Sequence, residues 1–114
     1  MKRKLWDPSI GLPYSERGGL RWVDGLFGGL FVSWPFAQLH CTRTQCTLGL
    51  GLWHPSPKFV FERSDIIAIH RKRKGLWFAA RIEHRRAEYP ALIEYGTFIY
   101  PRLQEHLRSL GYPA

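Results

Sequence analysis

The order of the elements that the sequence predicts constrains the fold of this chain more than any motif does. Seven stretches of strand-like residues, separated by glycine, proline and charged residues, precede a single amphipathic helix. The predicted strands are residues 27–33, 36–42, 46–52, 58–62, 65–73, 76–85 and 91–97. Short strands at regular spacing are typical of a sandwich or barrel. The predicted fold class is therefore mainly β: a seven-stranded bent barrel or sandwich capped by one C-terminal α-helix.

The helix prediction covers residues 101–110. Three leucines recur at i, i+4 and i+7, a spacing that places them on one helical face. They are Leu103, Leu107 and Leu110. Pro101 suits the first turn of a helix, and Gly111 suits the left-handed position after its last turn. We expect the three leucines, with Phe98 just ahead of them, to close one end of the barrel.

The first 25 residues differ from the rest of the chain. Glycine and proline interrupt this segment repeatedly, and no hydrophobic period is sustained in it. We therefore predict an extended N-terminal arm over residues 1–25 and one domain over residues 26–114, a length that fits a single domain. The rings of Trp6, Tyr14 and Trp22 are expected to pack on that domain as local anchors.

The charge balance predicts attraction to anionic partners. The chain has 17 lysines and arginines against 9 aspartates and glutamates, a net charge of +8. Its longest uncharged stretch, residues 25–40, is interrupted by glycines and a proline, so it predicts two strands and not a membrane span. The basic N-terminus is not followed by the apolar segment of an export signal. We therefore expect a cytoplasmic protein with reduced thiols, either soluble or peripheral to a membrane.

Cys41 and Cys46 provide a test of strand register. Strand alternation directs both thiols to the apolar side, and the loop 42–45 places them opposite each other. A buried pair of free thiols is the favoured interpretation. A disulfide under oxidising conditions and a metal site that includes His40 and His54 are the alternatives. The four-residue gap between the cysteines is not the usual zinc spacing, so neither a metal nor another cofactor is predicted.

The candidate binding site is a hairpin around Gly75 that is rich in basic residues. Its predicted residues are His70, Arg71, Lys72, Arg73, Lys74, Trp77, Arg81, Arg85 and Arg86. Such a cationic tip suits docking on an anionic membrane. It also suits nucleic-acid binding, with Trp77 and Phe78 stacking on bases. The third interpretation is a solvated hairpin whose charges protect a sheet edge.

Catalytic motifs are not evident in the sequence. No serine has the flanking glycines of a nucleophile elbow, and no glycine-rich phosphate loop is followed by lysine and serine or threonine. Most carboxylates can be assigned to turns or to solvent-facing positions. The sequence therefore favours a binding or structural module over an enzyme.

Residues 33–114 resemble bacterial PH-like domains related to the GRAM family. The resemblance is carried by Ser33-Trp34-Pro35-Phe36-Ala37, Phe59-Val60-Phe61, Ser64-Asp65-Ile66, Arg81-Ile82-Glu83-His84, Tyr89-Pro90, Thr97-Phe98 and Leu110-Gly111-Tyr112-Pro113. It implies a strongly bent seven-stranded barrel that the C-terminal helix closes at one end. Some PH domains bind phosphoinositides through a basic loop between their first two strands. The corresponding junction here, Ser33-Trp34-Pro35, is not basic, so the resemblance implies no inherited site.

Together these observations predict a non-enzymatic, PH-like binding module. We expect its basic face to dock a protein partner or an anionic membrane surface. The alternative is a small basic barrel that binds nucleic acid. The sequence carries no signal for an oligomeric state.

Overall fold

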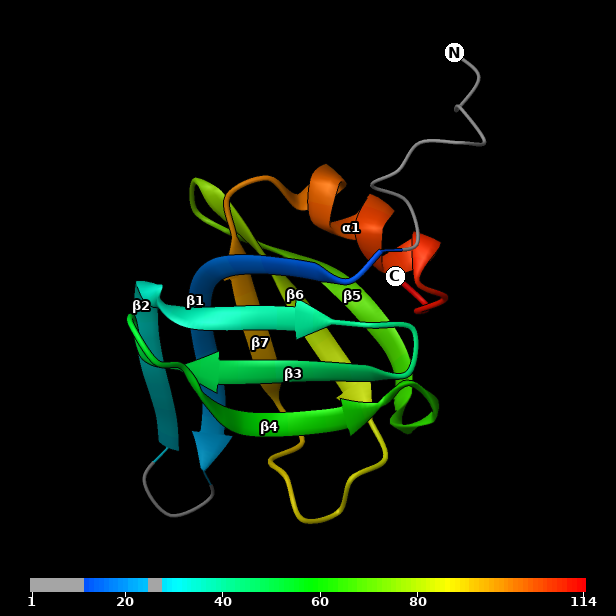
Figure 1. Cartoon of the computed structure of the whole chain (residues 1–114). Coiled ribbons are helices and arrows are strands. Elements are labelled where there is room, and N and C mark those ends of the chain that lie inside the picture. Colours follow the sequence, from blue (N-terminus) through cyan, green and yellow to red (C-terminus); the bar gives the residue numbers. More distant parts are fainter. Residues whose placement is uncertain (1–11, 25–27) are drawn as a thin grey trace.

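The computed structural model describes residues 12–24 and 28–114, and this part of the chain is mainly β (Figure 1). Its elements are β1 (Tyr14–Asp24), β2 (Gly28–Cys41), β3 (Gln45–Leu50), β4 (Ser56–Glu62), the short 3-10 turn η1 (Arg63–Asp65), β5 (Ile66–Lys74), β6 (Trp77–His84), β7 (Ile93–Thr97) and α1 (Tyr100–Ser109). The predicted fold class, seven strands followed by one C-terminal helix, is confirmed.

All seven strands belong to one antiparallel sheet in the order β4-β3-β2-β1-β7-β6-β5. β4 and β5 follow each other in the chain but form the two edges of the sheet, and η1 connects them. The sheet bends around a single core and stays open between these edges (Figure 1). The fold is therefore a bent, sandwich-like sheet whose concave side holds the core and whose other side faces outward.

The prediction of an extended arm is wrong for the residues that form β1. This strand is the centre of the sheet, paired with β2 on one side and β7 on the other. Tyr14 and Trp22 are buried in the core, as expected for anchors, whereas Trp6 lies outside the described residues. Gly18, which interrupts the hydrophobic pattern, is required by close packing, because a Cβ at this position would overlap the Gly96 carbonyl oxygen and the Tyr95 ring.

Residues 28–33 and 36–41 of the two predicted strands belong to one long strand, β2. Gly18 pairs with Ala37 while Leu20 pairs with Val32, so the intervening residues of β2 bulge away from β1 and the sheet turns sharply there. The number of strands in the described residues is still seven, because two predicted strands form one and β1 is a strand that was not predicted.

This long strand also corrects the position of the Ser33-Trp34-Pro35 junction. The resemblance placed it between the first two strands, but it lies inside β2, where the Trp34–Pro35 peptide is cis. The connection between β1 and β2 spans residues 25–27, outside the described residues.

The helix begins and ends one residue earlier than predicted, and its three leucines are buried as expected. Gly111 adopts φ +92°, the left-handed conformation predicted for it. The expectation for Phe98 is wrong, since its side chain is 56% exposed and Tyr100 packs into the core instead. Thr97 faces the core at the end of β7, so the alternation of the strand turns Phe98 to the outer face.

The cysteine pair follows the predicted register. Cys41 lies opposite Cys46 across β2 and β3, both are buried free thiols, and their Sγ atoms are 2.6 Å apart. The hydrogen bond with Cys46 and burial raise the pKa of the Cys41 thiol. Within residues 12–24 and 28–114, no three His, Cys, Asp or Glu side chains gather closely enough to hold a metal ion. No helix in the described part of the chain has the length and apolar character to cross a membrane.

Candidate binding site

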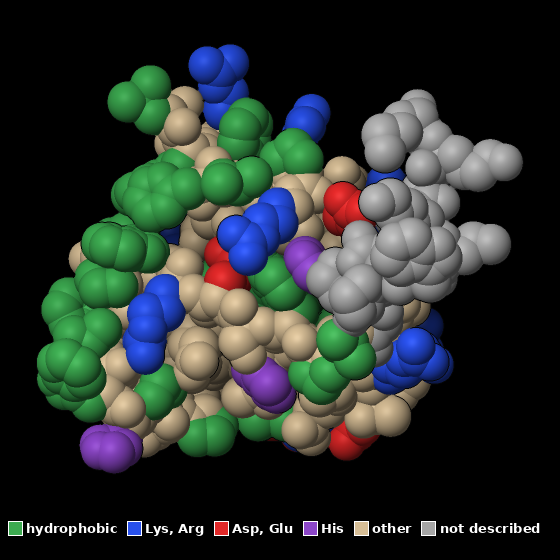
Figure 2. Space-filling view, turned by 45° about the horizontal axis from the view of Figure 1, so that its top comes forward, with side chains coloured by type: hydrophobic (Ala, Val, Ile, Leu, Met, Phe, Trp, Pro, Cys, Tyr) green, Lys and Arg blue, Asp and Glu red, His purple; other side chains and the backbone are tan. Residues whose placement is uncertain are grey.

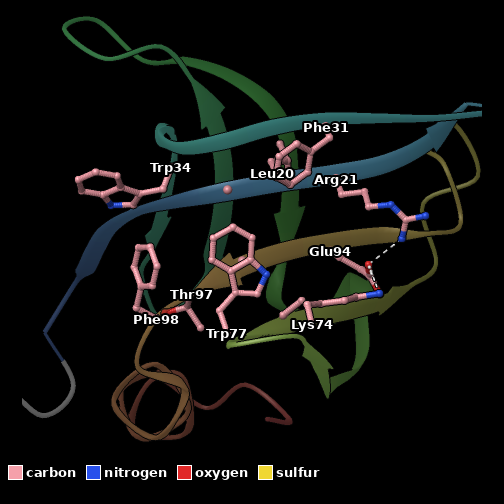
Figure 3. A pocket seen from close by; sticks show the side chains of 12 residues that line it. Leu20, Arg21, Phe31, Trp34, Lys74, Trp77, Glu94, Thr97 and Phe98 are labelled. Atoms are coloured by element: carbon pink, nitrogen blue, oxygen red, sulfur yellow. Dashed lines mark hydrogen bonds and ion pairs between the residues drawn. The ribbon is translucent and has the colours of Figure 1, made fainter.

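A cavity lies on the outer face of the sheet, over three adjacent strands (Figure 3). Its floor is a row of small residues. Gly19 of β1 pairs with Gly96 of β7, which in turn pairs with Ala79 of β6. Because these residues have at most a methyl side chain, the sheet surface is hollow between the longer side chains around them. The cavity has a volume of about 260 Å³.

Aromatic side chains form the walls of this cavity. Phe98 lies between two indoles, with ring centroids 5.9 Å from Trp34 and 5.7 Å from Trp77, both in edge-to-face geometry. Phe31 from the first half of β2 borders the cavity on the β1–β2 side (Figure 3). All four rings are partly exposed, so their faces and edges are available to a ligand.

A carboxylate surrounded by cations lies at one end of the cavity (Figure 3). The Glu94 side chain is only 2% exposed. Arg21 Nη1 donates to Glu94 Oε1 at 3.0 Å, and Lys74 Nζ lies 3.3 Å from the same oxygen. Arg81 donates to Oε2 from Nε at 2.9 Å and approaches it with a second nitrogen at 2.7 Å. Three cations from three strands thus share one buried carboxylate.

Hydrogen bonding decides the charge state of Glu94. Burial on its own raises the pKa of this carboxyl group, but donation from Arg81, Arg21 and Lys74 outweighs burial, and the net pKa lies below its usual value. Glu94 is therefore ionised at neutral pH and is a poor proton acceptor. The four side chains together carry a net charge of +2, which makes this end of the cavity electropositive.

The register of the β5–β6 hairpin divides the predicted basic residues between two faces. The predicted residues at even positions of β5, with Trp77 and Arg81 of β6, lie on the outer face near the cavity. They are His70, Lys72 and Lys74. Of the nine predicted residues, Lys74 and Trp77 line the cavity itself.

The other predicted residues lie elsewhere. Arg71 and Arg73 alternate to the opposite face of β5, where the Arg71 guanidinium covers the Phe78 ring at 5.4 Å. Arg85 and Arg86 lie beyond the far end of β6, and Arg86 pairs with Asp65 at 3.2 Å and with Glu88 at 3.0 Å. The basic set is therefore not one patch, and Arg86 connects two loops.

Most residues of the cavity were missed by sequence reasoning. Phe31, Trp34, Phe98, Arg21 and Glu94 come from β1, β2 and the end of β7 and have no common motif. One signal was present: Glu94 is a charged residue between the core residues of β7, at a position where strand alternation turns it away from the core. Its partners depend on the pairing of β1, β7 and β6, which no local pattern reveals.

A second carboxylate, Glu16, accepts hydrogen bonds from residues of two neighbouring strands. Tyr14, Tyr95 and Thr97 donate hydroxyl hydrogen bonds to it at 2.8, 3.1 and 3.0 Å. Burial is the main cause that raises the pKa of both tyrosines, so these phenols stay protonated as donors. The cluster therefore connects β1 to β7 and lacks an activated nucleophile.

Comparison with models of known protein families finds no match for this chain, and comparison with curated proteins finds none either. The resemblance to PH-like domains therefore stays a prediction from the residues that carry it. The geometry and charge of the site itself are therefore the observations that bear on function.

Proposed function

We propose that this protein is a non-enzymatic binding module that docks peripherally on an anionic membrane surface. The observation that supports this proposal is a group of exposed apolar side chains at one end of the sheet, flanked by cations. We call this group the apolar rim; it consists of Trp34, Leu76, Trp77, Phe98 and Ile99.

The apolar rim combines two projecting tips with a connected aromatic base. Leu76 is fully exposed in the turn of the β5–β6 hairpin, and Ile99 is 58% exposed in the connection between β7 and α1. Phe98, next to Ile99, contacts the indole of Trp77, next to Leu76, and also that of Trp34, so the two tips share one aromatic base. Figure 2 shows hydrophobic side chains gathered along the left side of that view. Soluble monomers rarely leave a continuous patch of this kind uncovered without a binding role.

Cations flank the apolar rim on both sides. Lys74 pairs with Trp77 in the hairpin, and Arg73 donates to the Gly75 carbonyl oxygen in the same turn. On the other side, Arg17 and Arg102 line a hollow together with Phe98 and Ile99. Each cation near an anionic bilayer contributes about 1 kcal/mol, and burying one leucine contributes roughly 2 kcal/mol. Tryptophan at the level of the head groups fits the same arrangement.

Nucleic-acid binding is a weaker candidate because one of its two predicted rings is covered. Phe78 is half-buried. Its ring centroid lies 6.3 Å from that of Tyr100, and the Arg71 guanidinium covers it. Trp77 therefore remains as the only one of the predicted pair with an exposed ring.

Co-sedimentation with vesicles of phosphatidylcholine containing 30% phosphatidylserine tests the proposal. We expect binding at low salt that weakens as salt increases, with little binding to pure phosphatidylcholine. Arg73→Glu should weaken binding several-fold, whereas Arg85→Glu, with the same charge change at the far end of β6, should weaken it less. Leu76→Asp should nearly abolish binding, whereas Ile67→Asp, at the start of β5, should leave most of it.

Two outcomes would refute membrane docking. One is the absence of binding to anionic vesicles at low salt, which makes a protein partner the leading explanation of the apolar rim. The other is tighter binding to single-stranded DNA or RNA than to vesicles, with Leu76→Asp without effect, which supports the nucleic-acid alternative.

A further inference from the structure

We infer that the cavity beside the apolar rim binds a small ligand that combines a planar aromatic ring with an anionic group. This goes beyond membrane docking, because the cavity has its own floor and charged end, formed by residues outside the apolar rim. The two sites share the rings of Trp34, Trp77 and Phe98, so variants at residues outside these rings are needed to separate them.

The shape of the cavity supports a flat apolar body. No side chain longer than a methyl group rises from its floor of Gly19, Gly96 and Ala79, so a flat ring can approach the sheet there. A volume of about 260 Å³ holds roughly nine water-sized groups at about 30 Å³ each, which is the size of a bicyclic ring. A ring on this floor meets the indoles of Trp34 and Trp77, and such aromatic pairs contribute about 1 kcal/mol beyond burial.

The charged end of the cavity supports a negative group on that ring. Arg81 lies outside the lining and balances the Glu94 carboxylate. Arg21 and Lys74 do line the cavity, and each uses one nitrogen on Glu94. Arg21 has further N–H groups, as does the ammonium of Lys74, and both side chains are more than one-third exposed. Two cations whose charge is not fully balanced by Glu94 therefore line the cavity.

The same charges argue against a cationic ligand. Aromatic rings arranged around a cavity often hold alkylammonium groups. Here the only carboxylate that lines the described cavity, Glu94, is already shared by three cations, so an added cation meets net repulsion. Charge complementarity therefore selects an anion. Aromatic carboxylates and aryl phosphates share the required chemistry.

Titration calorimetry with three indoles of matched shape tests the charge rule. We expect indole-3-acetate to bind at least tenfold more tightly than indole-3-acetamide, and tryptamine to bind most weakly. Equal affinity for acid and amide, tightest binding of tryptamine, or no binding of any of the three at millimolar concentration would overturn the inference. Parallel titrations with phenyl phosphate and phenylacetate, which carry the same ring, identify the anion as phosphate if phenyl phosphate binds more tightly, and as carboxylate if phenylacetate does.

The location is tested in the wild-type protein by the indole N–H signals in a ¹⁵N NMR spectrum. Indole-3-acetate should shift the signals of Trp34 and Trp77, which line the cavity, and should leave Trp53 in the β3–β4 connection unchanged. Shifts confined to Trp53 would show that the ligand binds outside the cavity.

Gly96→Val separates this site from membrane docking. A Cβ at Gly96 meets no atom closer than 3.8 Å, and its φ is not positive, so β7 has room for a Cβ there, and the methyl groups of valine should fill the cavity floor. We expect at least a tenfold loss of indole-3-acetate affinity with unchanged vesicle binding. Leu76→Asp should give the reverse pattern. Full ligand affinity in folded Gly96→Val would remove the cavity as the site, whatever the result with vesicles.

Discussion

Replacing Glu94 with glutamine tests whether this carboxylate holds the outer face of the sheet together. Glutamine keeps the size of the side chain but provides one acceptor oxygen in place of two. The NH2 end of its carboxamide must then face either Arg81 or the pair Arg21 and Lys74. On that side of residue 94, N–H donors face N–H donors and no hydrogen bond forms. The variant therefore removes charge from all three contacts and breaks the geometry of at least one.

The expected loss follows from burial and contact strength. Hydrogen bonds to a charged group contribute about 1.5–3 kcal/mol each, but the three cations are more than one-third exposed and water replaces part of the loss. We expect Glu94→Gln to lower the free energy of unfolding at pH 7 by about 3 kcal/mol, which is roughly 10 °C in Tm for a domain of this size. Denaturant unfolding followed by tryptophan fluorescence measures it.

The pH dependence provides a second readout with a defined sign. The pKa of Glu94 is lowered in the folded state, so its contribution is present above the unfolded carboxyl pKa of about 4.3 and is lost as the pH falls toward the folded value. The difference in unfolding free energy between wild type and Glu94→Gln should therefore be constant from pH 6 to 8 and shrink below about pH 4.

Glu83→Gln is the matched control for this experiment. Glu83 also pairs with a basic residue on the outer face, at 2.9 Å from His70, but both side chains are about half exposed. We expect that variant to lose about 0.5 kcal/mol or less. If Glu94→Gln loses no more than Glu83→Gln, or if its loss is independent of pH, the carboxylate does not have the role that its contacts imply.

Three further predictions concern the core. Leu107→Ala should lower the free energy of unfolding by about 3 kcal/mol, because Leu107 is 2% exposed under the open end of the sheet. A loss below about 1 kcal/mol in denaturant unfolding would contradict the capping role of α1. Gly18→Ala should lower Tm in thermal unfolding far more than Gly96→Ala, because only the first Cβ overlaps the opposing strand, and equal effects would contradict the close approach of β1 to β7. The thiols of Cys41 and Cys46 should react slowly with Ellman's reagent in the native protein and fully after unfolding, whereas rapid labelling of both in the native state would contradict their burial.

Features that depend on neighbouring residues were predictable. The three leucines of the C-terminal helix are four and three residues apart, and this spacing alone places them on one face. The conformation of Gly111 follows from its position after the last turn. The opposition of Cys41 and Cys46 follows from strand alternation and a short loop. In each case one turn or one hairpin determines the outcome.

Two errors arose where local patterns compete with tertiary packing. Gly18 and Gly19 interrupt the hydrophobic pattern of their segment, so β1 was predicted to be an arm, although close contact with β7 and β2 is what requires glycine there. Pro35 divided β2 into two predicted strands, whereas the structure uses it inside a bulge opposite Gly19. Glycine and proline mark close contacts and bends as well as chain breaks.

The sequence by itself determined the class of elements, the apolar face of the helix, the thiol pairing and the positive charge, because each depends on composition or on residues a few positions apart. Only the tertiary structure decided which outer-face residues meet. Gly19, Ala79 and Gly96 form one floor, and Arg21, Arg81 and Glu94 form one charged row, because β1 and β6 both pair with β7 in a specific register. That register is set by burial of the opposite face of the sheet, so the cavity on the outer face results from packing in the core.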